Sequence, residues 1–109
     1  MNTNTNFTRT EPSIEEMPIG SYGTAWIQWM QDNHKEKVRE MKLKGIFLTV
    51  ARSVDESARD YRNLLDRQYE KANPRPETFM EIVSWERTRE FYTDSAVMRE
   101  SVLIPITSP

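Results

Sequence analysis

The chain holds little of the side-chain chemistry that enzymes use most often. Its 109 residues include one histidine, His34, and no cysteine, so few residues could form the pair of nucleophile and histidine base that many enzymes use. No Glu-x-x-His pair of the di-metal bundle type occurs. Glutamates spaced i, i+4 could form a carboxylate dyad, but the same spacing is typical of solvated helix faces with salt bridges. The glutamate pairs with this spacing are Glu36/Glu40, Glu77/Glu81 and Glu86/Glu90. We therefore expect no enzyme activity, no cofactor and no metal.

A basic segment is the first candidate for binding. Residues 34–52 contain six basic and two acidic side chains, a net charge of +4 in a chain whose net charge is −2. A short basic helix can lie against nucleic-acid phosphates. The alternative is a charged helix face that meets acidic neighbours in the same protein. The basic residues are Lys35, Lys37, Arg39, Lys42, Lys44 and Arg52.

Aromatic and acidic side chains form the second candidate. Tryptophan and tyrosine dominate the energetics of protein interfaces, but in a domain this small they also serve as core residues. Carboxylates on the later helices could meet a basic protein surface by taking the place of phosphates. The partner-binding residues predicted on this basis are Tyr22, Trp26, Trp29, Asp55, Glu56, Asp60, Glu77, Glu81, Glu86 and Glu90.

Apolar spacing places these residues on four helices. The first begins at Ser21 or Thr24, either of which could cap it, and ends near Asn33. The second covers about 35–44, with Asn33 and Glu36 in capping-box spacing and Gly45 after its end. Two long helices follow, at about 46–72 and 77–103, separated by the prolines of residues 73–76. A second capping-box spacing would permit a break near residue 54, but the apolar stripe stays in phase and favours continuity.

The predicted architecture is a small all-α domain with two long antiparallel helices and two shorter N-terminal helices packed on them. We expect residues 1–13 to be a disordered tail, residues 14–104 to be the domain, and 105–109 to be a second tail. No apolar run approaches the length of a membrane span and the N-terminus has no signal-peptide pattern, so we expect a cytoplasmic protein without a membrane partner. Incomplete apolar stripes leave room for a homodimer through the last helix.

One series of residues follows a recognisable order along the chain: Glu16, Pro18-Ile19-Gly20, Gly23, Leu43-Lys44-Gly45, Asp55, Ala58, Trp85 and Leu103-Ile104. In these residues the chain resembles the TnpV family of small transposon-encoded proteins of Gram-positive bacteria, over about residues 14–104. It departs from the family in its polar N-terminal tail and its Asn-Pro-Arg-Pro linker. The family has no established catalytic residues to transfer.

The resemblance implies a protein carried by a mobile element, and two hypotheses follow. Small acidic proteins of such elements often block a host defence protein, as anti-CRISPR proteins do, so this chain would inhibit a host defence nucleoprotein such as a CRISPR effector. Alternatively, it is a DNA-binding accessory or regulator of transposition that uses the basic segment. The first hypothesis needs a contiguous acidic surface, and the second needs the six basic residues on one open face.

Overall fold

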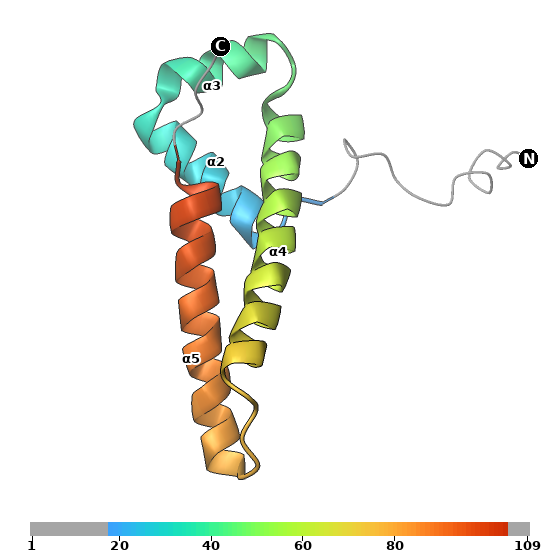
Figure 1. The fold of residues 1–109 in the computed structure, drawn as a ribbon. Helices are drawn as coiled ribbons and strands as arrows, with labels where there is room; N and C mark the ends of the chain where they lie inside the picture. The colour runs from blue at the N-terminus through green and yellow to red at the C-terminus, as the bar shows by residue number, and fades with distance from the viewer. Residues whose placement is uncertain (1–17, 105–109) are drawn as a thin grey trace, which may run out of the picture.

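The computed structural model describes residues 18–104, and this part of the chain is helical without any strand. Its elements in order are α2 (Ser21–Asn33), α3 (Lys35–Leu43), α4 (Phe47–Ala72), α5 (Phe79–Val97) and the π-helical turn η2 (Met98–Val102). The two long helices form a hairpin, and α2 and α3 lie across one end of it (Figure 1). The all-α class is therefore confirmed. The two predicted tails and residues 14–17 lie outside the described residues.

Contacts along the hairpin define the direction of its two helices. Tyr61 of α4 donates a hydrogen bond to Glu100, just beyond α5. Further along α4, the ring of Tyr69 lies 5.9 Å from that of Tyr92 and 6.0 Å from that of Trp85. Residues with higher numbers on α4 thus contact residues with lower numbers on α5. The two helices therefore run in opposite directions, as Figure 1 shows.

The predicted caps of the two short helices are wrong, although the helix ranges agree with the structure. The residue before α2 is Gly20, and neither Ser21 nor Thr24 makes a side-chain cap. No side chain caps α3 either: its N-cap residue is His34, and the Asn33 amide donates back to the carbonyl of Trp29 at 2.9 Å. The predicted capping box at residues 33–36 therefore does not form. A different group supplies the cap of α2, as described below.

The turn between α3 and α4 depends on glycine. Gly45 has a φ of 72°, in the left-handed region that glycine adopts without strain. The Ile46 N–H then donates to the Met41 carbonyl at 2.9 Å, which satisfies a free group at the end of α3. Helix α4 runs without a break through residue 54 to Ala72, two residues before Pro74. The favoured prediction of one continuous helix is confirmed.

The last helix changes its winding near its end. It begins at Phe79, two residues after the predicted start, and its α-helical part ends at Val97. The chain then makes a π turn in which the Leu103 N–H donates to the Met98 carbonyl at 2.8 Å. A π turn holds one extra residue, so it shifts the side chains that follow. Val102 is thereby fully buried in the core.

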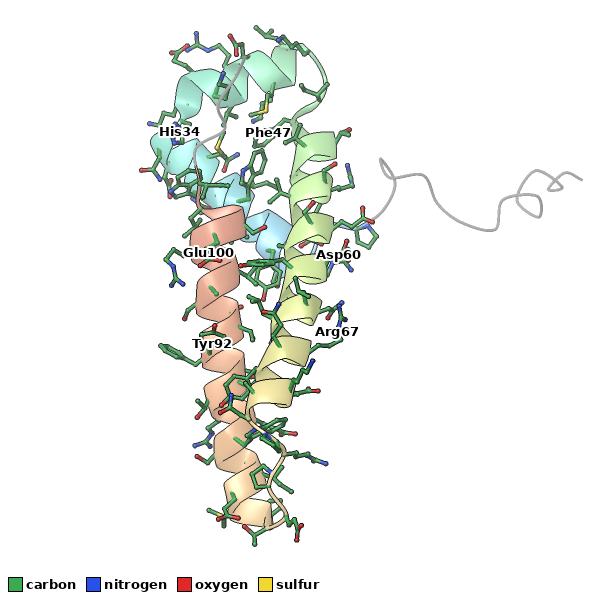
Figure 2. The ribbon with its side chains drawn as sticks, viewed as in Figure 1. His34, Phe47, Asp60, Arg67, Tyr92 and Glu100 are labelled. Carbon is green, nitrogen blue, oxygen red and sulfur yellow. The ribbon has the colours of Figure 1, made fainter. Side chains whose placement is uncertain are left out.

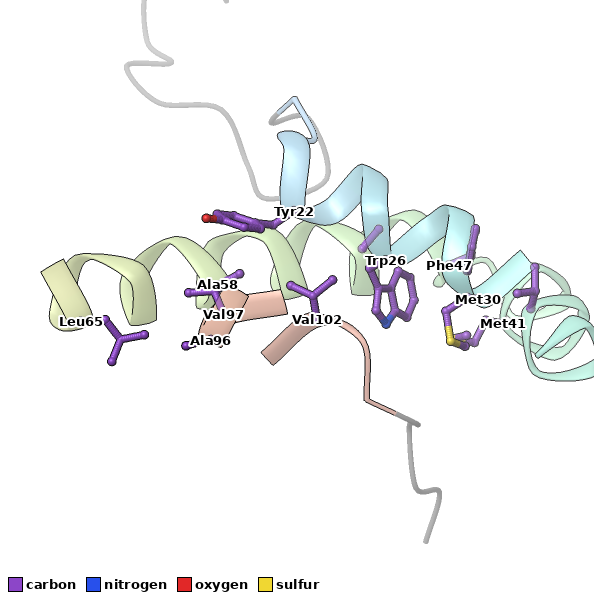
Figure 3. Packing of buried hydrophobic residues seen from close by; sticks show 12 residues of the cluster. Tyr22, Trp26, Met30, Met41, Phe47, Ala58, Leu65, Ala96, Val97 and Val102 are labelled. Atoms are coloured by element: carbon purple, nitrogen blue, oxygen red, sulfur yellow. The ribbon is translucent and has the colours of Figure 1, made fainter. Parts of the chain in front are cut away.

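The hydrophobic core occupies only the end of the hairpin that α2 and α3 cover. Trp26 and Met30 of α2 are buried there together with Phe47, whose ring centroid is 5.4 Å from that of Trp26 (Figure 3). No side chain from Asp66 to Tyr92 is buried. We name residues 66–92 the arm. Within residues 18–104, no helix combines the length and apolarity needed to cross a membrane.

Candidate partner-binding surfaces

Asp55 is a buried residue that holds α2 against α4. Its carboxylate Oδ1 accepts a hydrogen bond from the Gly23 N–H at 2.8 Å, and Oδ2 lies 3.1 Å from Nε of Arg59. Only 2% of Asp55 is exposed. A carboxylate at a helix N-terminus satisfies a free N–H and interacts favourably with the helix dipole. The structure therefore corrects the prediction of Asp55 as a partner-binding residue, because its side chain faces inward and caps α2.

The two glycines before and within α2 permit this contact. A Cβ at Gly20 would lie 2.9 Å from each Asp55 carboxylate oxygen. A Cβ at Gly23 would lie 2.6 Å from Cγ2 of Ile19 and 2.9 Å from the carbonyl oxygen of Ala51. Both positions must lack a side chain for the helices to approach this closely. Ile19, Gly20 and Gly23 thus form a packing motif in this chain.

Two of the predicted aromatic anchors are core residues. Trp26 is 1% exposed, and the ring of Tyr22 is buried with its hydroxyl group between two charged side chains. That hydroxyl donates to Asp94 Oδ1 at 2.8 Å and accepts from Nη1 of Arg62 at 3.0 Å. Burial, reinforced by the hydrogen bond to Asp94, raises the pKa of Tyr22 above its ordinary value. Both predictions of a partner contact are therefore wrong for this fold.

The third aromatic anchor, Trp29, is only partly buried. It packs against the core cluster, and its ring meets that of His34 edge-on with 4.9 Å between centroids. His34 thus packs at the junction of α2 and α3. Among residues 18–104, no group of three or more potential ligands is arranged to hold a metal ion.

Glu56 and Asp60 are exposed carboxylates one turn apart on α4. They border an open hollow of about 580 Å³ between α2 and α4, which Ser21 and Arg59 also line. Neither carboxylate has an ion-pair partner within the described part of the chain. The side chain of Asp60 points away from α5 (Figure 2). These two predicted residues are therefore open to a partner.

The predicted carboxylates at the arm do not extend this surface. Glu81 accepts a hydrogen bond from Thr78 at 2.7 Å, and Glu86 lies 3.8 Å from Arg75. Five residues separate Glu81 from Glu86, which places them about 140° apart around α5. Glu77 precedes α5, and Glu90 lines a separate hollow with Arg62 and Arg87. The acidic residues are thus divided among several faces, and the contiguous acidic surface that the inhibitor hypothesis needs is limited to Glu56 and Asp60.

The basic segment is also divided. Lys35, Arg39 and Lys42 are exposed and spaced i, i+4, i+7, so they share one face of α3, which lies beside the buried Val38 and Met41. The other three basic residues lie elsewhere: Lys37 3.7 Å from Glu40, Lys44 in the turn after α3, and Arg52 on α4. Half of the predicted nucleic-acid residues therefore form one open face.

Arg89 is an interhelical residue that the sequence patterns did not single out. Its guanidinium Nη1 lies 2.7 Å from Glu70 Oε2, and its Nε lies 3.8 Å from Asp66 Oδ1. The guanidinium also stacks over the Trp85 ring at 5.1 Å. Arg89 lies one turn after Trp85 on the apolar stripe of α5, and this position could have indicated from the sequence that it faces α4. The Arg89–Glu70 ion pair and the ring contacts of Tyr69 thus join the two helices of the arm, where no residue is buried.

No protein-family model, curated protein or solved structure matches this chain.

Proposed function

We propose that this protein acts by stoichiometric binding to a basic protein surface, as an inhibitor of a host defence nucleoprotein such as a CRISPR effector. The observation that carries the proposal is the pair of exposed carboxylates of Glu56 and Asp60, unpaired within residues 18–104, beside an open hollow. The host defence setting comes from the resemblance to the TnpV family.

The chemistry of this pair suits an arginine or lysine from a partner. Guanidinium groups form strong, directional hydrogen bonds with carboxylates, and the hollow beside α4 provides room for such a side chain. Channels that hold nucleic acid are lined with basic residues because they neutralise phosphates. Carboxylates that occupy such a channel compete with the nucleic acid. Binding of this kind weakens as the salt concentration rises.

A charge reversal tests the proposal. In the variant E56K/D60K we expect inhibition of CRISPR effector cleavage to weaken by about tenfold or more. The matched control E77K/E81K reverses two exposed charges at the arm and should inhibit as the unmodified protein does. Capture of the effector on the immobilised protein, before and after nuclease treatment, separates protein binding from nucleic-acid bridging. Cleavage that is unaffected by a many-fold molar excess of the protein would refute the proposal.

A second candidate is the DNA-binding accessory of transposition, and one observation favours it. Lys35, Arg39 and Lys42 share an exposed face of α3, as a helix that lies along phosphates requires. The variant K35E/R39E/K42E should then lose DNA binding in a mobility-shift titration. Its control, R67E/K71E/R75E, reverses three exposed charges at the arm and should retain binding. Equal DNA affinity of the first variant and the unmodified protein would exclude this function.

A further inference from the structure

Helix α5 carries side chains of core type on two opposite sides. One side, which includes Trp85 and Tyr92, faces Tyr69 of α4. On the other side Met80 is 72% exposed and Phe91 is 76% exposed. Met80 and Phe91 are the ends of a row spaced i, i+4, i+7, i+11, so the row follows one face of the helix. We name this row the outer stripe, and its members are Met80, Ser84, Arg87 and Phe91.

The corresponding outer face of α4 has a different character. Its row with the same spacing is Asp60, Leu64, Arg67 and Lys71, so three of its four members are charged. Figure 2 shows Asp60 and Arg67 on the side of α4 away from α5. A solvated helix face normally looks like that of α4. An outer stripe that ends in methionine and phenylalanine is instead typical of a face that packs on another helix.

We propose that the outer stripe is a homodimer interface, in which α5 of one copy packs antiparallel on α5 of a second copy. The stripe is self-complementary when it is reversed. Met80 then meets Phe91 of the second copy, a favourable sulfur–aromatic pair, and Ser84 meets Arg87. A two-fold interface requires this property, because the same surface serves both copies. Ser84 leaves room at the centre for the Arg87 side chain.

The apolar area that this interface buries predicts the affinity of the dimer. Burial of Met80 and Phe91, the two apolar members of the outer stripe, removes roughly 300 Å² of apolar surface per copy from water. A standard stable interface buries about 800 Å² per partner, so the dimer forms at high concentration and dissociates on dilution. The small net charge of −2 opposes this association little.

Sedimentation of the full chain over a concentration series tests the proposal. We expect the average mass to rise towards that of a dimer, and the variants M80E and F91E to remain monomeric. The variant R67E changes the outer face of α4 by a comparable charge and should dimerise as the unmodified protein does. Circular dichroism verifies that each variant is folded. The proposal is overturned if the unmodified chain stays monomeric throughout, or if folded M80E and F91E still dimerise.

A double variant tests the antiparallel arrangement. In M80E/F91K, antiparallel packing brings each introduced carboxylate to an introduced ammonium group of the second copy. Dimerisation should therefore recover relative to M80E and to F91K. Parallel packing would instead place like charges together. A double variant that remains folded and monomeric contradicts the antiparallel interface, whereas recovery supports it over any contact that does not pair these two positions.

Discussion

Asp55 of α4 caps α2 across 32 positions of sequence, through the 2.8 Å hydrogen bond from the Gly23 N–H to its carboxylate. The variant D55A leaves this buried N–H without a partner and removes a charge from the helix N-terminus. We expect it to lower the free energy of unfolding by about 2–3 kcal/mol. Urea denaturation followed by circular dichroism measures the loss. The variant D55N keeps an acceptor oxygen and should lose clearly less, so equal losses would mean that the hydrogen bond is not the cause.

Gly23 should not tolerate alanine, although alanine favours helices by about 1 kcal/mol. The new methyl group would lie 2.9 Å from the carbonyl oxygen of Ala51, a backbone atom that cannot move without displacing α4. Overpacking of this kind costs about 1–3 kcal/mol, so we expect a net loss of stability for G23A. The exposed neighbour Thr24 provides the control, because T24A gains helix propensity without a clash. A thermal melt in which G23A unfolds at the temperature of T24A, or above it, would contradict the packing argument.

Stability should fall at alkaline pH partly because of Tyr22. Burial and the hydrogen bond to Asp94 raise the pKa of this phenol above 10.0 in the folded protein. The unfolded chain therefore releases the proton first as the pH rises, and the free energy of unfolding decreases through and above pH 10. The variant Y22F lacks this proton, so its stability deficit relative to the unmodified protein should shrink between pH 8 and pH 11. A deficit that is constant over that range would show that Tyr22 titrates normally.

The carboxyl group of Glu100 should titrate below its ordinary value. The hydrogen bond from Tyr61 is the main cause that lowers its pKa, and the hydrogen bond from Arg99 is the second. Carbon-detected NMR titration of the side chain should give a midpoint below 4.5. The variant Y61F should raise that midpoint, and R99Q should raise it less. A midpoint that Y61F does not move would mean that the Tyr61 hydroxyl does not bond to Glu100 in solution.

Helix positions were predictable because they depend on spacing along the chain. The apolar stripe of α4 stays in phase from Phe47 to Leu65, and Pro74 prevents the helix from continuing far beyond Ala72. The turn at Gly45 was predictable for a similar reason, since a left-handed residue after a helix is usually glycine. Such features are local, so a single sequence contains them.

The caps and the buried polar residues depend on contacts between helices. Ser21 and Thr24 have the side chains of capping residues, but α2 receives its cap from Asp55, which spacing within α2 cannot reveal. The same limit made Asp55 and Tyr22 look like surface residues, because an acidic or phenolic side chain gives no sign of its buried partner. Glu56 and Asp60 were predicted from their charge, and they are exposed, as most charged side chains without a buried partner are.

The arm described above shares its longest helix with the core. Helix α4 is continuous, but its first half lies beneath α2 whereas its last seven residues, 66–72, have no buried side chain. Local opening of a helix costs little free energy where few apolar contacts must break. Amide hydrogens at the end of α4 should therefore exchange with deuterium much faster than those near Ala51 and Ala58. Binding of any molecule to the arm should slow this exchange. The exchange rate at the end of α4 therefore indicates whether the arm is bound.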